Sequence, residues 1–174
     1  MVRLAGWVIL WLLLFPGMAV AAQNPLWEFG IRGGKKAWGV DEDYRVREIY
    51  LLRALPWSAA LAKGVLTTRL DFSTGHLEAD GDEGAILAMG LDLVWQSAEG
   101  EVEIEGGFRP TVLDEHVFGS DDYGGFQQFT SHLGIALKIA PFMCSYRYQH
   151  TSNAGIYDSN DGLNLHLFGI GYRF

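Results

Sequence analysis

Hydrophobic and polar residues alternate along most of the chain, with Leu91 and Leu93, for example, on either side of Asp92. Successive side chains of a β-strand point to opposite faces, so this alternation indicates strands with one apolar and one polar face. Glycine, threonine and aromatic residues are frequent in the same segments, as is typical of strands. The pattern predicts eight strands, near 26–35, 44–55, 64–75, 84–96, 100–110, 125–139, 141–153 and 162–174.

The connections between the predicted strands alternate in length. Short turns are expected after the second, fourth and sixth strands, around Pro56-Trp57-Ser58, Ser97-Ala98-Glu99 and Ala140-Pro141. Longer polar loops are expected after the first, third, fifth and seventh strands, at 36–43, 76–83, 111–124 and 154–161. Short turns at one end and long loops at the other are typical of barrels in the bacterial outer membrane. The sequence therefore predicts an all-β fold, an eight-stranded antiparallel transmembrane β-barrel.

The faces of individual strands refine this picture. An even number of strands places both chain ends on the short-turn side, where Tyr172 and Phe174 would join an aromatic girdle.

The fifth strand carries three glutamates on one face, and carboxylates in a narrow lumen need cationic partners. The alternative is a soluble sandwich with a charged outer face. In a barrel, Glu101, Glu103 and Glu105 would meet the inward-facing Arg69, Lys138, Arg147 and Arg173.

The N-terminal segment resembles a secretory signal. Arg3 precedes an apolar run from Val8 to Phe15, and small residues follow up to Ala22. We expect residues 1–22 to be a cleaved signal peptide and residues 23–174 to form the barrel domain. A retained anchor is the alternative, but the run is shorter than the roughly 20 residues that a spanning helix needs. No later segment is long and apolar enough for such a helix.

Composition narrows the function classes. The formal net charge of −8 argues against nucleic acid as a partner, because phosphate binding needs a basic surface. The single cysteine, Cys144, excludes an internal disulfide and fits a small lipid-facing residue better than a nucleophile. Neither a metal-ligand spacing nor a glycine-rich phosphate loop occurs, so no metal or cofactor is expected.

The seventh predicted strand carries residues that could act in catalysis. Tyr146, Tyr148, His150 and Ser152 share its apolar face, which a membrane barrel turns outward. The Cα atoms of His150 and Ser152 would lie about 6.6 Å apart, a gap that an imidazole can span to accept the serine proton. Both residues precede the fourth long loop, so they would face lipid at the extracellular side. The last strand offers Asn164 and His166 on the same outer face as groups that could orient the imidazole.

The residues of this region resemble a known family. His150-Thr151-Ser152-Asn153-Ala154-Gly155, followed by Asn160-Asp161-Gly162, is similar to the motif of the outer-membrane lipid A 3-O-deacylases of the PagL type. The resemblance implies an eight-stranded barrel that hydrolyses the ester-linked acyl chain at the 3-position of lipid A with a Ser-His-Glu triad. It further implies Ser152 as nucleophile and His150 as base.

The match differs from the family at the third member of the triad. The family glutamate falls at Asn164, and we favour this amide as the orienting group, as in Cys-His-Asn proteases. Asp158, Asp161 and His166 are nearby alternatives. By motif position, Asn153, Gly155 and Asn160 are the residues expected to support the oxyanion or substrate, although Asn160-Asp161-Gly162 would also suit a simple turn.

The expected substrate is therefore lipid A, as part of lipopolysaccharide in the outer leaflet of the outer membrane. Tyr146 and Tyr148 would line its acyl chain. A homodimer is left open as the state of assembly. The missing glutamate favours one alternative, a non-catalytic structural or adhesive barrel. Another is a related lipid esterase, phospholipase or acyltransferase that uses the same pair.

Overall fold

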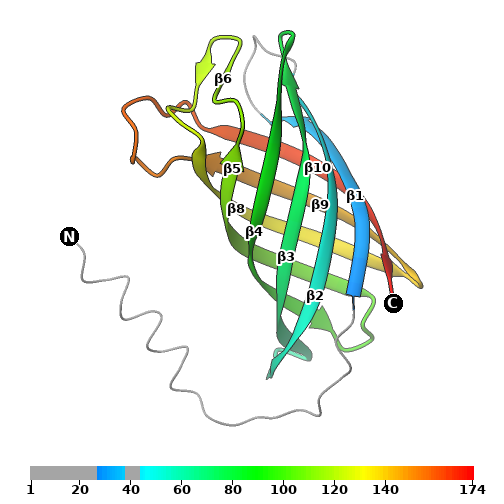
Figure 1. Ribbon diagram of the computed structural model, residues 1–174. Coiled ribbons are helices and arrows are strands. Elements are labelled where there is room, and N and C mark those ends of the chain that lie inside the picture. The colour runs from blue at the N-terminus through cyan, green and yellow to red at the C-terminus, as the bar shows by residue number, and fades with distance from the viewer. Residues whose placement is uncertain (1–26, 38–43) are drawn as a thin grey trace, which may run out of the picture.

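The chain folds into one closed antiparallel barrel, which the computed structural model describes over residues 27–37 and 44–174 (Figure 1). The expected signal peptide and its cleavage site lie outside the described residues. Eight strands close in the order β1-β10-β9-β8-β5-β4-β3-β2, and β6 and β7 form a small hairpin within a loop. The strands are β1 (Trp27–Lys36), β2 (Arg45–Leu61), β3 (Gly64–Ala79), β4 (Asp82–Ser97), β5 (Val102–Leu113), β6 (Val117–Phe118), β7 (Asp121–Asp122), β8 (Gln127–Ile139), β9 (Phe142–Ser152) and β10 (Leu163–Arg173).

Large apolar side chains cover the outside of this barrel. Ile31, Leu133 and Phe168 are exposed by 60%, 64% and 65%, although each lies in the middle of a regular strand. A soluble sandwich would bury such a face, whereas a barrel in lipid turns it outward. The eight-stranded antiparallel barrel is thus confirmed and the soluble sandwich was wrong. Within the described residues, no helix is long and apolar enough to cross a membrane.

The half of the lumen nearer the short turns is filled by a network of ion pairs. Arg147 donates to Asp71 at 2.8 Å and to Glu105 at 2.8 Å, and Arg69 bonds to Asp92 at 3.0 Å. Six carboxylates and five guanidinium groups take part, almost all of them buried. The members are Glu28, Arg32, Glu48, Arg69, Asp71, Asp92, Glu103, Glu105, Arg109, Arg147 and Arg173.

Most of the expected partners of the fifth-strand glutamates are correct. Arg69 pairs with Glu103 and Glu105, Arg147 pairs with Glu105, and Arg173 pairs with Glu103. Lys138 and Glu101 were placed in the lumen wrongly, because both side chains are exposed. Lys138 lies near the short-turn end of β8 and Glu101 directly before β5, where water can solvate both charges.

The half of the lumen nearer the long loops contains an apolar cluster on the β10 side, whereas buried threonines and glutamines line it on β5, β8 and β9. Leu163, Leu165 and Leu167 point inward from β10 and are at most 1% exposed. They belong to a buried cluster that Phe118 and Tyr123 complete from the loop after β5. The long-loop end of the barrel is therefore closed by a hydrophobic core. This core packs against the inner side of the barrel wall and makes that part of the wall rigid.

Two of the expected connections were wrong. Strand β2 continues through Pro56-Trp57-Ser58, with a register shift between Ala54 and Ser58, and turns only at Ala62 and Lys63. The expected loop at 76–83 is instead a tight hairpin, in which β3 and β4 extend to Asp80-Gly81. Both turn residues have positive φ, the geometry that Asp-Gly favours in two-residue hairpins.

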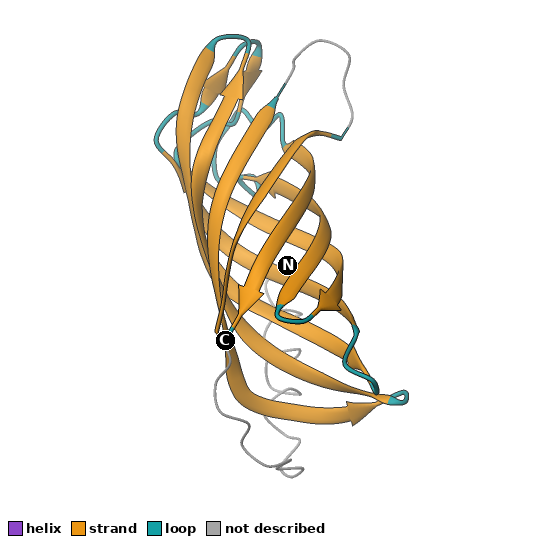
Figure 2. Cartoon of the chain, turned by 90° about the vertical axis from the view of Figure 1, so that its right-hand side faces the viewer, coloured by secondary structure: helices purple, strands orange, loops and turns teal. Residues whose placement is uncertain are grey.

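The expected loop at 36–43 lies mostly outside the described residues, and the other described connections follow the prediction. Short turns join β4 to β5 and β8 to β9, and longer loops follow β5 and β9. The chain ends of the barrel meet on the short-turn side, where the backbones of Trp27 and Phe174 exchange two hydrogen bonds of 2.9 Å. Figure 2 shows the strands winding obliquely around the barrel, with short turns at the end that carries the C-terminus and the larger loops at the other end.

Candidate active site

Two neighbouring strands, β9 and β10, carry the candidate residues on the outer wall at the long-loop end. Ser152 is the last residue of β9, and Asn164 is the second residue of β10. Asn164 lies directly opposite His150 in the register of the two strands. His150, Ser152 and Asn164 are partly exposed, whereas the intervening Thr151 is buried in the lumen. The three side chains therefore share the outward face.

Asn164 contacts the imidazole directly. The Nδ1 atom of His150 lies 2.9 Å from the Oδ1 atom of Asn164. An amide oxygen can only accept, so Nδ1 carries the hydrogen and Nε2 presents its lone pair. The hydroxyl of Tyr148 donates to the same oxygen at 2.9 Å. This arrangement holds the tautomer that a general base requires.

The other candidates for orienting His150 are engaged elsewhere. His166 bonds through Nδ1 to the hydroxyl of Tyr146 at 2.7 Å. Asp161 accepts the backbone N–H of Asp122 at 2.6 Å, and Asp158 is exposed in the loop. Among the described residues, Asn164 is the one of these candidates that is hydrogen bonded to His150.

Ser152 and His150 are aligned without being hydrogen bonded to each other in the described part of the chain. Their spacing of two residues places their Cα atoms about 6.6 Å apart on the same face. Gly162 leaves room for the imidazole, since a Cβ there would lie only 3.3 Å from the Cε1 atom of His150. Catalytic hydrogen bonds are often long in a free enzyme and shorten when substrate binds.

The loop after β9 is organised by Asn153. Its side chain is fully buried and donates to the carbonyls of Tyr123 at 2.9 Å and Ser159 at 2.6 Å. Its Oδ1 atom accepts the N–H of Gly155 at 2.7 Å. Its backbone N–H donates to the Oδ1 atom of Asn160 at 3.2 Å. Asn153 and the Gly155 amide therefore hold the loop, and the amide oxygen of Asn160 is anchored one residue beyond Ser152.

The loop after β5 supports the loop after β9. The backbone N–H of Gly124 and the ring of His116 hydrogen bond to Asp122, and they hold the pKa of that carboxyl below its usual range. The backbones of Asp122 and Asp161 are also joined directly, at 3.3 Å. The loops after β5 and β9 are thus cross-linked above the site.

Ser131 was missed by the analysis of the sequence. It is exposed on the outer face of β8 and lies opposite His150 in the register. Side chains that are directly opposite in an antiparallel pair have Cβ atoms about 5 Å apart. The outward parity of Ser131 could be read from the sequence, but its pairing with His150 depends on the register of β8 and β9.

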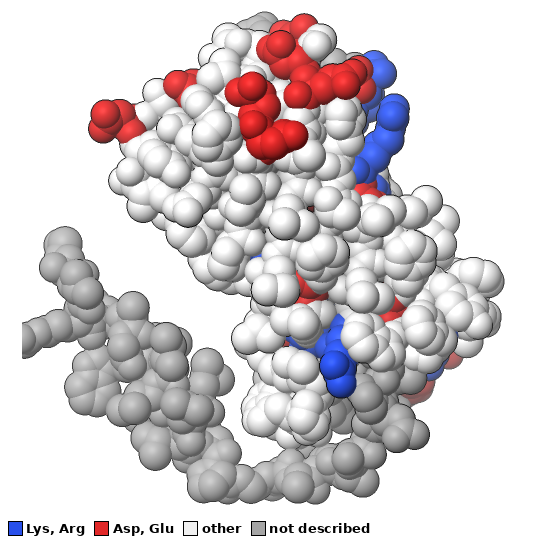
Figure 3. All heavy atoms as spheres, in the orientation of Figure 1, with Lys and Arg blue, Asp and Glu red and all other residues white. Residues whose placement is uncertain are grey.

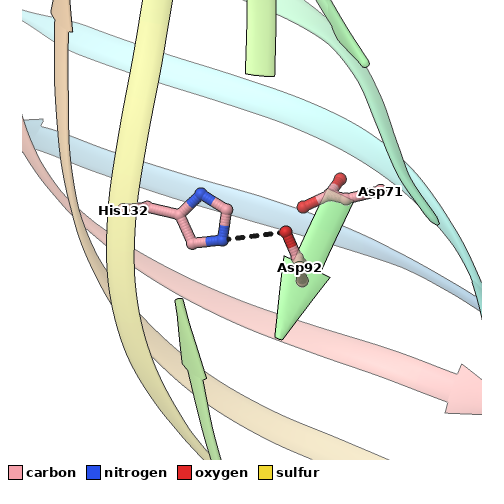
Figure 4. A group of neighbouring side chains, drawn as sticks. All are labelled: Asp71, Asp92 and His132. Atoms are coloured by element: carbon pink, nitrogen blue, oxygen red, sulfur yellow. Dashed lines mark ion pairs between the residues drawn. The ribbon is translucent and has the colours of Figure 1, made fainter. Parts of the chain in front are cut away.

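One group of potential metal ligands occurs in the described residues, inside the lumen. Asp71, Asp92 and His132 have ligand atoms within 4.8 Å of one another, and Figure 4 shows the imidazole of His132 directed at Asp92. Both carboxylates already pair with arginines, Asp71 with Arg147 and Asp92 with Arg69. This cluster is part of the ion-pair network and lies on the opposite side of the wall from Ser152.

Comparison with known proteins identifies relatives of the whole barrel. A family model described as lipid A 3-O-deacylase (PagL) matches residues 27–173. Lipid A deacylase PagL of Bordetella bronchiseptica is 35% identical over 72 residues, which cover 41% of this chain and 40% of that protein. The aligned region thus spans about two fifths of the length of this curated relative.

Solved structures share the fold. The crystal structure of the outer membrane enzyme PagL superposes with a TM-score of 0.74 at 20% identity, covering 83% of this chain and 98% of that one. The outer membrane protein Ail of Yersinia pestis, in a phospholipid bilayer nanodisc, gives a TM-score of 0.50 at 15% identity and covers 84% and 99% of the two chains. At these identities, the likeness establishes the barrel architecture.

Proposed function

The chain belongs to the lipid A 3-O-deacylase (PagL) family, and on this basis we propose that it hydrolyses the ester-linked 3-hydroxyacyl chain at the 3-position of lipid A. The observation that carries the proposal is the hydrogen bond of 2.9 Å between His150 and Asn164, next to Ser152 on the lipid-facing wall. The proposed location is the outer membrane, with the site in the outer leaflet. One barrel suffices, since all three residues come from the same chain and no homodimer is required.

The proposed mechanism is acyl transfer to water. The Nε2 atom of His150 takes the proton of Ser152 as the serine oxygen attacks the ester carbonyl. Collapse of the tetrahedral intermediate releases the sugar hydroxyl, which receives the proton from His150, and leaves an acyl-serine. A water molecule, deprotonated by His150, then releases the fatty acid and restores Ser152. Tyr146 and Tyr148 are placed to line the acyl chain on the same face.

Asn160 is the proposed side-chain donor to the oxyanion. Its Oδ1 atom is held by the backbone N–H of Asn153, so its NH₂ group is left to donate close to Ser152. The N–H of Gly155 is the second proposed donor, and it would first have to leave the Oδ1 atom of Asn153. Asn153 itself supports the substrate site by fixing the loop.

Mass spectrometry of lipid A from cells that express this chain tests the proposed function. The expected spectrum lacks the mass of one 3-hydroxyacyl group relative to cells with an empty vector. Unchanged lipid A, together with a folded barrel in the outer membrane, would favour the non-catalytic barrel. Release of fatty acid from phospholipid vesicles instead would favour the phospholipase alternative.

Replacing Asn164 by glutamate is expected to raise kcat about 10-fold. The amide already sets the tautomer of His150, so the carboxylate adds only the charge that stabilises the imidazolium, worth about 1.4 kcal/mol. The acid limb of the pH–rate profile should move to higher pH, because a carboxylate favours the protonated ring. Asn164→Leu is the control and should lower kcat. Equal kcat in all three proteins would show that Asn164 does not orient His150.

Replacing Tyr148 by phenylalanine is expected to lower kcat about 5-fold, because Asn164 loses one of the two donors that fix its amide oxygen. KM should change little, since the aromatic ring that faces the lipid is kept. Steady-state kinetics in detergent micelles measures both constants. A rise in KM at constant kcat would instead assign the hydroxyl to substrate binding.

A further inference from the structure

Three basic side chains stand on the outer wall beside the proposed site. Lys35 is at the end of β1, and Arg45 and Arg47 are at the start of β2, all exposed and on the outward face. They occupy the long-loop ends of their strands, as Ser152 does on β9. Figure 3 shows basic side chains gathered along one upper edge of the molecule, while acidic side chains cover the neighbouring loops.

This basic surface, formed by Lys35, Arg45 and Arg47, is confined to β1 and β2. Within residues 27–37 and 44–174, no other exposed lysine or arginine lies at the long-loop end. The outward residues of the adjoining β3 and β4 include Glu78 and Glu83, and those of β8 are uncharged there. The positive charge thus borders the β9–β10 site on one side only.

The basic surface sits directly above an apolar belt. Ile31 and Ile49 are paired across β1 and β2 and exposed by 60% and 48%. The next outward pair toward the loops is Gly33 and Arg47, and the pair after it is Lys35 and Arg45. A lipid whose acyl chains cover the belt would therefore hold its headgroup at the height of the three cations.

The distance from the catalytic serine suits one lipid A molecule. Lys35 pairs with His166, which pairs with Tyr148, so Lys35 is two strands across and four residues down from Ser152. Their Cα atoms are about 16 Å apart along the wall. The long side chain of Lys35 covers part of this gap, and the headgroup of one lipid A molecule would span the rest.

We propose that Lys35, Arg45 and Arg47 form a subsite that binds a phosphate group of the lipid A headgroup and so orients the 3-position ester toward Ser152. The inference rests on the proposed deacylase function for its choice of ligand. Guanidinium and ammonium groups are the side chains that bind phosphate most strongly, and each contributes about 5-fold in affinity near an anionic lipid surface. The subsite makes lipid A with its phosphates the preferred substrate.

Binding without turnover is the first test. The Ser152→Ala barrel, immobilised in neutral detergent micelles, is expected to retain radiolabelled lipid A about 100-fold more tightly than the same lipid stripped of phosphate. The added substitutions Lys35→Gln, Arg45→Gln and Arg47→Gln should abolish this preference. Arg53→Gln, an exposed arginine in the middle of β2 that lies opposite Trp27 at the start of β1, is the matched control and should keep it. No preference, or a preference that survives the triple substitution, would overturn the subsite.

Steady-state kinetics on the two lipids tests the phosphate subsite separately from the deacylase function. With Ser152 present, the triple variant should show a kcat/KM about 100-fold lower for phosphorylated lipid A, with the rate on dephosphorylated lipid A unchanged. Equal losses on both lipids would contradict the subsite. If no form of the protein releases acyl chains while the binding preference is present and lost in the triple variant, the deacylase function fails and the phosphate subsite stands. Heat-dependent gel mobility reports that each variant is folded.

Discussion

Ser152→Ala is expected to abolish release of the 3-hydroxyacyl chain, with kcat falling by about 10⁴-fold or more. Removing the nucleophile of a serine hydrolase leaves only the oxyanion donors and substrate binding, and such removal has cost about 10⁶ in turnover elsewhere. The side chain is small and partly exposed at the end of β9, so the barrel should fold as before. Mass spectrometry of lipid A from expressing cells, with kinetics on purified lipid A, measures the loss.

Ser131→Ala is the matched control for this result. Ser131 lies on the same outer face and opposite His150 in the register, so the substitution removes an equivalent hydroxyl from the other side of the imidazole. Its activity should stay within a few fold of the original. Loss of activity in Ser131→Ala with turnover retained in Ser152→Ala would move the nucleophile to β8 and contradict the proposed mechanism.

Arg147→Met is expected to destabilise the barrel by about 3–5 kcal/mol. Arg147 is 2% exposed and pairs with Asp71 at 2.8 Å and with Glu105 at 2.6 Å. Removing one partner of a buried ion pair leaves uncompensated charge in a place that water cannot easily reach. Unfolding by urea in lipid vesicles, followed by gel mobility, measures the change in free energy.

Lys138→Met provides the comparison for Arg147→Met. Lys138 is exposed at the end of β8, so its loss should change the free energy of unfolding by less than about 0.5 kcal/mol. Equal stability of Arg147→Met and the original protein would show that water or the neighbouring arginines, Arg69 and Arg109, compensate Asp71 and Glu105. That result would remove the ion-pair network as a main source of stability for the lumen.

The outer face of the barrel was the part of the fold that the sequence predicted best. Alternation of Leu91 and Leu93 with Asp92 is a local pattern, and a strand repeats it with a period of two. The same parity placed His150 and Ser152 on the lipid face. The same parity did not settle the second strand, where Arg45 and Arg47 share a face with Ile49, and the structure shows that this face is the outer one.

The lumen was harder to predict from the sequence, because ion pairs fill one half of it and a buried hydrophobic cluster lies in the other half. The sequence indicated ion pairs for Arg69, Arg147 and Arg173. The outward parity of Asn164 and His166 also implied that the leucines between them face inward, but it did not indicate that Leu163, Leu165 and Leu167 join a buried apolar cluster. A membrane barrel is expected to have a polar lumen, but a buried apolar cluster lies in the lumen under the long loops. Only the three-dimensional packing of Phe118 and Tyr123 against β10 could show it.

The sequence by itself determined the number of barrel strands, the face of most of their residues and the motif that indicates the chemistry, since these depend on neighbours along the chain. The tertiary structure decided which residues meet across strands: Asn164 with His150, Ser131 with His150, and Asn153 with Tyr123. Register and barrel closure set these contacts, and they arise from the sum of many side-chain contacts between strands rather than from any local pattern.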